Sequence, residues 1–285
     1  MYLKNEMGPG EDYENASGVR WSLLKHLRDA SPMHYQHALD SRRTDRETSD
    51  ALRFGRAVHC MVFEPEWFAA RFVTYAESKS VGEGARKKWQ AFQEEHKHHT
   101  LLSKDEWDRA HSIALAIAAH PIAHELLQVG RAEVPLRFDT PQGVQCKAKL
   151  DWLTRPIGIV DLKTALHIEE RVFSTVAWKL GYFHQAAMYR RAVSFGTGVP
   201  VFDIPYHIIA VEPSEPFDIA VYQLDEEGLQ VANDELTDLI TYLADCRAKN
   251  RWPGRYESKQ LLRAPKWATM DDDDEEWEVS TDAGS

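Results

Sequence analysis

The chain has 285 residues, of which 43% are hydrophobic and nine are tryptophans, so it can bury a substantial core as one large or two small domains. It contains no apolar run near the ~18 residues of a membrane span and no charged-then-apolar leader, which predicts a cytoplasmic protein without a membrane segment. Its three cysteines (Cys60, Cys146 and Cys246) are odd in number and far apart, which excludes a disulfide framework and a cysteine-rich metal site.

The negative charge is concentrated at the C-terminus. The net charge is −11, and residues 268–285 hold eight acidic residues and no basic one, which leaves −3 for residues 1–267. We therefore expect a single folded domain over residues 1–267 and a disordered acidic tail over residues 268–285. A nearly neutral body still permits local basic patches.

The hydrophobic periodicity predicts the following elements. Helices are expected over residues 17–31, 33–39, 50–63, 104–119, 121–127, 168–194 and 226–250. Strands are expected over residues 132–138, 144–153, 157–163, 202–212 and 217–224. Residues 1–15 are polar and are expected to be poorly ordered, and residues 73–99 are charged and are expected to be partly helical. The order of elements predicts an α/β (α+β) fold in which helices flank a mixed central sheet.

The two predicted strands around residues 150 and 160 form a hairpin in which apolar and polar residues alternate. A five-residue loop would pair Leu153 with Ile159 and place Asp151 opposite Asp161. Lys163 would project from the same face as Asp161. Like charges that are directly opposed destabilise a strand pair, so a cation is expected between the two carboxylates. A solvated strand face with scattered charges is the alternative.

Asp151, followed by Asp161-Leu162-Lys163 after an apolar run, resembles the D…(D/E)-x-K signature of the PD-(D/E)xK nucleases. The short signature becomes specific because Phe54–His59 (FGRAVH) and Glu64–Glu66 (EPE) precede it and Phe183–Tyr189 (FHQAAMY) follows it. This combination is similar to the phage-type 5′→3′ exonucleases, the lambda exonuclease and exonuclease VIII group, over most of the chain. One departure is Leu150, which stands where the family name has a proline.

The resemblance implies a restriction-endonuclease-like αβββαβ core and a metal-dependent active site. The implied metal ligands are His59, Asp151, Asp161 and the carbonyl oxygen of Leu162. They would bind Mg²⁺, as two ions per active site, and Mn²⁺ would substitute because it accepts an imidazole ligand more readily. Without the resemblance, a helical histidine such as His59 is more often packed or exposed than a ligand.

The resemblance also implies catalytic roles for Asp151, Asp161, Lys163 and Gln185. Lys163 would orient or deprotonate the attacking water and offset developing charge. Gln185 would position water or substrate, and a hydrogen bond between helix and sheet is its alternative role.

Contacts to DNA phosphates are expected from several further residues. The candidates are Arg20, Ser22, Arg53, Arg56, Lys147, Lys149 and Tyr189. Ser22 begins a predicted helix where, by the resemblance, the terminal 5′-phosphate would bind, and helix N-termini attract anions. An ordinary surface position is the alternative for each arginine. Residues 41–50 hold three further arginines and form either a solvated linker or a DNA-contacting segment.

The function implied by the resemblance is a processive 5′→3′ exonuclease that degrades one strand of linear duplex DNA with a 5′-phosphate. It would leave 3′ overhangs for a single-strand annealing recombinase, as a phage or prophage protein in a bacterial host cell. A homo-oligomeric ring, expected to be a trimer, would retain the DNA because a body of net charge −3 offers few phosphate contacts. The alternatives are a structure-specific or restriction-like endonuclease and a non-catalytic DNA-end-binding module.

Overall fold

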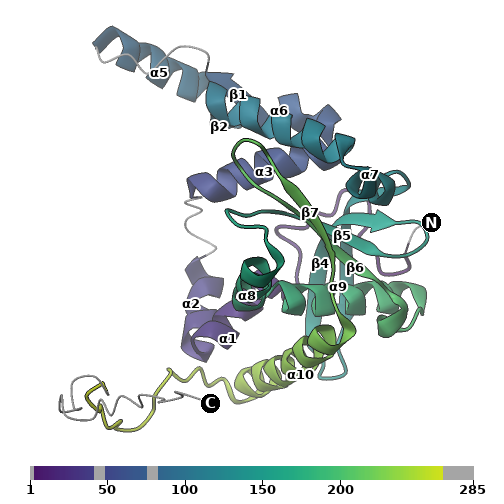
Figure 1. The fold of residues 1–285 in the computed structure, drawn as a ribbon. Coiled ribbons are helices and arrows are strands. Elements are labelled where there is room, and N and C mark those ends of the chain that lie inside the picture. The colour runs from purple at the N-terminus through teal and green to yellow at the C-terminus, as the bar shows by residue number, and fades with distance from the viewer. Residues whose placement is uncertain (1–2, 42–48, 76–82, 266–285) are drawn as a thin grey trace, which may run out of the picture.

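The computed structural model describes residues 3–41, 49–75 and 83–265, and its centre is a five-stranded mixed sheet (Figure 1). The strand order is β3-β4-β5-β6-β7. β5 and β6 are parallel, and the other neighbouring strands are antiparallel. The strands are β3 (Gly130–Asp139), β4 (Gln145–Thr154), β5 (Ile159–Thr164), β6 (Tyr206–Val211) and β7 (Ile219–Gln223). The predicted mixed sheet is thus confirmed.

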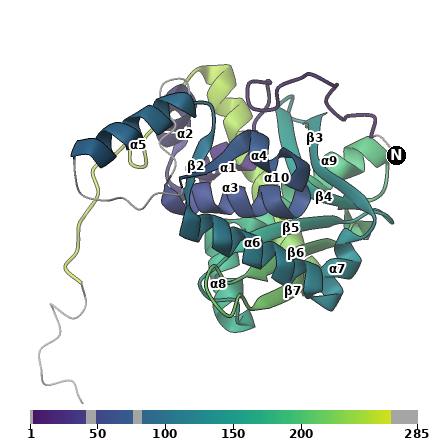
Figure 2. The same ribbon diagram turned by 90° about the horizontal axis from the view of Figure 1, so that it is seen from above.

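Helices cover both faces of this sheet (Figures 1 and 2). α3 and α6 lie on one face, and α1, α9 and α10 lie on the other. Among the described residues, no helix is both long and apolar enough to cross a membrane. The helices are α1 (Trp21–Asp29), α2 (Pro32–Ser41), α3 (Asp50–Phe63), α4 (Phe68–Arg71), α5 (Glu83–Glu95), α6 (Lys104–Ala119), α7 (Pro121–Leu127), α8 (Glu170–Leu180), α9 (Tyr182–Thr197) and α10 (Glu226–Lys249), with 3-10 turns η1 (Pro65–Trp67) and η2 (Val201–Asp203).

The two faces of the sheet belong to separate apolar cores. Along β5, Ile159 packs into the core that contains α1, α9 and α10, whereas Val160 and Leu162 pack into the core that contains α3 and α6. A strand that is buried on both faces reads as a continuous apolar run. Asp161 interrupts this run and is only 1% exposed, so the fold must provide polar partners for it.

Several predicted boundaries are confirmed. α6 and α7 have the predicted bounds, and α10 ends one residue earlier than predicted. α6 begins with a capping box, in which Ser103 accepts from the Glu106 amide and the Glu106 side chain accepts from the Ser103 amide. α3 begins as predicted, with Ser49 accepting from the Leu52 amide.

The predicted helix over residues 168–194 is wrong, because it is two helices that meet at Gly181. Gly181 has φ +77°, a left-handed conformation that ends α8. A Cβ atom there would lie 2.4 Å from Cζ2 of Trp21, which stacks on His184 with ring centroids 5.0 Å apart. The break therefore lets α1 pack closely against the start of α9.

The expectation that residues 1–15 are poorly ordered is wrong for the described residues 3–15. Leu3 and Met7 are 5% and 7% exposed, because they anchor this segment against the sheet. A short parallel pair between β1 (Phe72–Tyr75) and β2 (Thr100–Ser103) was also not predicted. The acidic tail and the arginine-rich part of residues 41–50 lie largely outside the described residues.

We expect Gly181→Ala to lower the free energy of unfolding by about 1–3 kcal/mol more than Gly198→Ala does. Both glycines end helices with φ near +78°, but a Cβ at Gly198 meets nothing within 4 Å. The two substitutions therefore share the cost of a left-handed backbone and differ in the clash with Trp21. Chemical denaturation measures the difference, and equal losses would contradict the packing role of Gly181.

Candidate active site

The candidate active site lies where β4 and β5 separate. The ladder pairs Leu153 with Ile159 and Trp152 with Val160, which confirms the predicted register. It stops before Asp151, whose Oδ2 instead accepts a hydrogen bond from the backbone amide of Leu162 at 3.0 Å. The expected face-to-face placement of the two aspartates is therefore replaced by an opening between the strands.

Asp161 is held from the side of α9 by two polar groups. Lys163, two residues further along β5, places its Nζ 2.6 Å from Oδ2 of Asp161. Gln185 on α9 donates from Nε2 to Oδ1 of Asp161 at 2.9 Å and accepts from Lys163 at 3.3 Å. Burial opposes the charge of Lys163, but the nearby Asp161 and Asp151 raise its pKa above the ordinary lysine value. One ion pair and two hydrogen bonds thus connect the three side chains.

A second cluster faces α3 and contains His59, Glu133 and Asp151, whose ligand atoms all lie within 4.8 Å of one another. His59 Nε2 lies 2.9 Å from the carbonyl oxygen of Leu162, so this nitrogen must carry the proton. The other nitrogen, Nδ1, then directs a lone pair at Oδ2 of Asp151, 3.4 Å away. A lone pair and a carboxylate oxygen at this distance require a proton or a cation between them.

The electrostatics of this second cluster favour the neutral forms of Asp151 and His59. Burial raises the pKa of Asp151 well above its ordinary value, and the charge of Asp161 raises it further. Burial lowers the pKa of His59, and the charge of Lys163 adds to this effect. A neutral imidazole is the form that binds metals.

Glu133 was not identified from the sequence. It lies on β3 between the pairs Ala132–Trp152 and Val134–Leu150, which is the position opposite Asp151. Its φ of +50° is unusual for a residue with a side chain and marks a local distortion of β3. Working out the register of the β3–β4 hairpin, in addition to that of β4–β5, would have revealed it.

Comparison with known proteins identifies the family. Residues 21–265 match the model of a PDDEXK-like domain of unknown function (DUF3799). The chain belongs to this family. The match confirms the predicted PD-(D/E)xK resemblance and the restriction-endonuclease-like fold, although it does not single out the lambda type. No curated protein matches the chain.

A solved structure has the same PDDEXK-like fold. The crystal structure of a candidate exonuclease from Eubacterium rectale aligns with a TM-score of 0.61 over 90% of this chain and 96% of the other. The two sequences are 18% identical, so the likeness concerns the fold.

The predicted phosphate-binding residues of this PDDEXK-like chain are not all directed at the site. Arg20 pairs with Glu14 at 2.8 Å, and Arg53 pairs with Asp50 and Glu106 at 2.7 and 2.5 Å. Lys147 is 4% exposed and donates to backbone carbonyls, which removes it from contact with DNA. Ser22 and Arg56 are exposed on α1 and α3. Lys149 forms an ion pair with Glu133, and Tyr189 is half-buried one turn after Gln185 on α9.

The cluster fits a divalent cation. PDDEXK nucleases generally use divalent metals. Here two carboxylates and one imidazole lie close together, which is a set of mostly oxygen donors suited to Mg²⁺ or Mn²⁺. The Leu162 carbonyl, also predicted as a ligand, is instead bound by Nε2 of His59. Asp161, which the sequence predicts as a metal ligand, pairs with Lys163, and the carboxylate that lies with His59 and Asp151 is Glu133.

We expect Glu133→Gln and His59→Ala to weaken Mn²⁺ binding by about tenfold or more, because each removes one donor from the cluster. Isothermal titration of the purified variants with Mn²⁺ and Mg²⁺ gives the dissociation constants. Asp139→Asn is the matched control, since this exposed acid lies on the same strand as Glu133. Unchanged dissociation constants for both site variants would contradict the assignment.

Proposed function

We propose that this PDDEXK-like protein is a Mg²⁺-dependent 5′→3′ exonuclease that degrades one strand of linear duplex DNA. The observation that supports hydrolysis is the arrangement around Leu162. Its amide binds Asp151 and its carbonyl binds His59, while its neighbours Asp161 and Lys163 point to the α9 side. Three successive residues of β5, Asp161 to Lys163, thereby bring a candidate metal cluster next to a carboxylate–ammonium pair.

Metal binding, stabilisation of charge and positioning would be carried out by different residues of the site. A divalent cation, when bound, polarises a phosphoryl oxygen and lowers the pKa of a coordinated water. His59, Glu133 and Asp151 would hold that cation. Lys163 places a positive charge where negative charge develops on the phosphate, and Gln185 fixes Lys163 against Asp161. Because Gln185 bonds to both members of the pair, it acts as a positioning residue.

We expect Asp161→Asn and Lys163→Met each to reduce kcat by roughly 10²–10³-fold, because each removes a charge that acts on the transition state. Release of acid-soluble label from a linear duplex in Mg²⁺ measures the rate. Lys249→Met is the matched control, since Lys249 pairs with Asp245 on the exposed side of α10. Activity near the wild-type level in both site variants would exclude this pair from catalysis.

The proposed dependence on DNA ends gives a separate prediction. A linear duplex labelled at one 5′ end should lose that label first, a 5′-phosphate should be preferred over a 5′-hydroxyl, and closed circles should stay intact. Cutting of closed circles would favour the restriction-like endonuclease. Binding of duplex ends without any cleavage in Mg²⁺ or Mn²⁺ would favour the non-catalytic end-binding module.

We further propose that the 3′ overhangs serve a single-strand annealing recombinase and that the protein assembles into a ring, most simply a trimer. The supporting argument is electrostatic. Because residues 1–267 carry a net charge of −3, their non-specific attraction to phosphates is weak. A ring of subunits that closes around the DNA is an alternative way to remain bound. Light scattering of the full-length protein in dilute solution tests the assembly, and a monomer that digests long tracts in one binding event would contradict it.

A further inference from the structure

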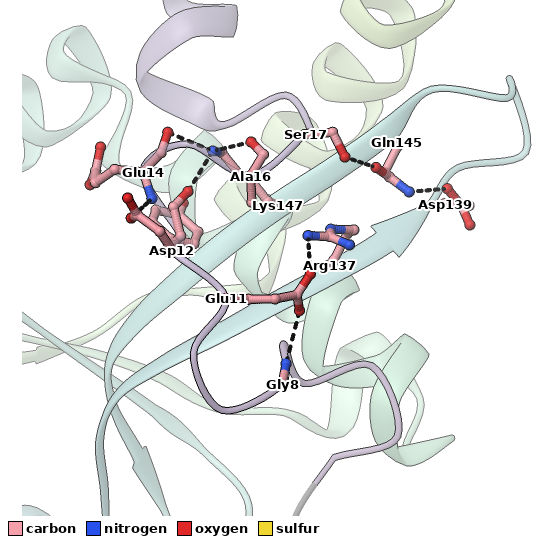
Figure 3. Close-up of polar contacts among 11 residues, drawn as sticks. Gly8, Glu11, Asp12, Glu14, Ala16, Ser17, Arg137, Asp139, Gln145 and Lys147 are labelled. Carbon is pink, nitrogen blue, oxygen red and sulfur yellow. Dashed lines mark hydrogen bonds and ion pairs between the residues drawn. The ribbon is translucent and has the colours of Figure 1, made fainter.

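Residues 3–20, which we call the N-terminal strap, cross one face of the β3–β4 ribbon (Figure 3). The strap begins beside the outer edge of β3, where Glu6 forms an antiparallel bridge with Leu136. It ends beside β4, where Val19 forms a parallel bridge with Cys146. The short β4–β5 ladder leaves this part of β4 open to the strap. The strap therefore spans the ribbon from one edge to the other.

Two cations on the covered face are bound by the strap. Arg137 donates to the carboxylate of Glu11 at 3.0 Å. Lys147 lies opposite Arg137 in the ladder, and its buried ammonium donates to three backbone oxygens. These are the carbonyl oxygens of Tyr13, Glu14 and Ala16, at 2.7, 3.4 and 2.8 Å. Because an unpartnered buried ammonium costs several kcal/mol, Lys147 stabilises this path of the strap.

The strap is shaped locally for this contact. The carboxylate of Asp12 accepts from the Glu14 amide at 2.9 Å, and its carbonyl accepts from the Ala16 amide at 2.8 Å, which forms a tight turn. Gly18 has φ +122°, and a Cβ there would lie 3.1 Å from Cβ of Lys147. Only glycine allows the strap to run this close to β4 in that conformation.

Tyr13 connects the strap to the candidate active site. Its ring centroid lies 4.8 Å from Nζ of Lys147 and 5.9 Å from Nζ of Lys149. Lys149 in turn forms an ion pair with Glu133 of the metal cluster. Burial, and then the charge of Tyr13, raise the pKa of Tyr189 well above its ordinary value. Tyr13 therefore lies beside the Lys149–Glu133 ion pair at the edge of the candidate active site.

We propose that Tyr13 and Lys149 form a nucleotide-binding subsite on the strap side of the active site. The Tyr13 ring stacks on the base of the nucleotide next to the scissile phosphate, and the Lys149 ammonium contacts the phosphate of that nucleotide. This inference rests on the proposed nuclease function. The family match covers residues 21–265, so most of the strap lies outside the matched region.

The chemistry of the subsite suits an enzyme that digests any sequence. Stacking of a base on an aromatic ring tolerates every base, because each base presents a π-face. The Lys149 ammonium supplies the phosphate contact that the nearly neutral body otherwise provides poorly. The hydrogen bonds from Lys147 to the strap keep the Tyr13 ring in place before DNA binds, which lowers the entropy cost of binding.

The test separates binding from chemistry with the full-length protein. Tyr13→Ala should raise KM for linear duplex about tenfold and raise the Kd for a short duplex in Ca²⁺ by the same factor, while kcat and the Mn²⁺ affinity stay within about twofold. Tyr13→Phe, which keeps the ring, should restore both values. Tyr13→Leu, which keeps apolar volume on the strap without a ring, should behave like Tyr13→Ala.

Glu11→Gln is the matched control, because Glu11 belongs to the strap but binds Arg137 on the covered part of the ribbon. It should leave KM and Kd unchanged. Wild-type KM and Kd in both Tyr13→Ala and Tyr13→Leu would overturn the subsite while the nuclease function stands. A loss of kcat or of Mn²⁺ affinity at unchanged KM would also overturn it. A wild-type protein that neither binds nor cuts DNA would overturn the proposed function itself.

Discussion

The candidate site depends on a carboxylate that is buried in the middle of the sheet. Asp161 stands among apolar neighbours on β5 and is almost fully shielded from water. A buried charge persists when it is paired and hydrogen-bonded. Lys163 supplies the opposite charge and Gln185 supplies a donor, so the position of α9 against β5 is fixed by polar as well as apolar contacts. The same contacts arrange the residues that we propose for catalysis.

The separation of β4 from β5 is the second constraint. In a regular ladder, the Leu162 amide and carbonyl would bond to the neighbouring backbone. Here the Leu162 amide bonds to Asp151 and its carbonyl bonds to His59. Contacts to two candidate metal ligands therefore replace the main-chain pairing between β4 and β5 at this point. The loss is limited because each backbone group still has a partner. The opening between the strands therefore leaves neither backbone group of Leu162 unpaired.

The N-terminal strap provides partners for the basic side chains on the rest of the β3–β4 ribbon. Arg137 and Lys147 would leave an unpaired basic face if the strap were absent, and the strap binds both. The covered cations hold the strap, whereas Lys149 remains beside the cluster with Glu133. Basic residues that are close in sequence thus have different roles, and their contacts rather than their spacing separate them.

The sequence by itself determined the features that depend on neighbouring residues. The Leu153–Ile159 register follows from loop length, and the bounds of α6 and α7 follow from caps and prolines. These signals act within a few residues and can be read from the chain. Through its motifs, the sequence also placed His59, Asp161 and Gln185 in one site.

Only the tertiary structure decided the rest. The break at Gly181 reflects the packing of Trp21, which is 160 residues away in sequence, and Glu133 enters the cluster through a distortion of β3. The hydrogen bond from Lys147 to the Tyr13 carbonyl joins residues more than 130 positions apart. Hydrophobic periodicity reports which face of an element is buried, but it does not report which distant side chain or carbonyl meets it there. Those contacts exist only after the helices and the strap have packed onto the sheet.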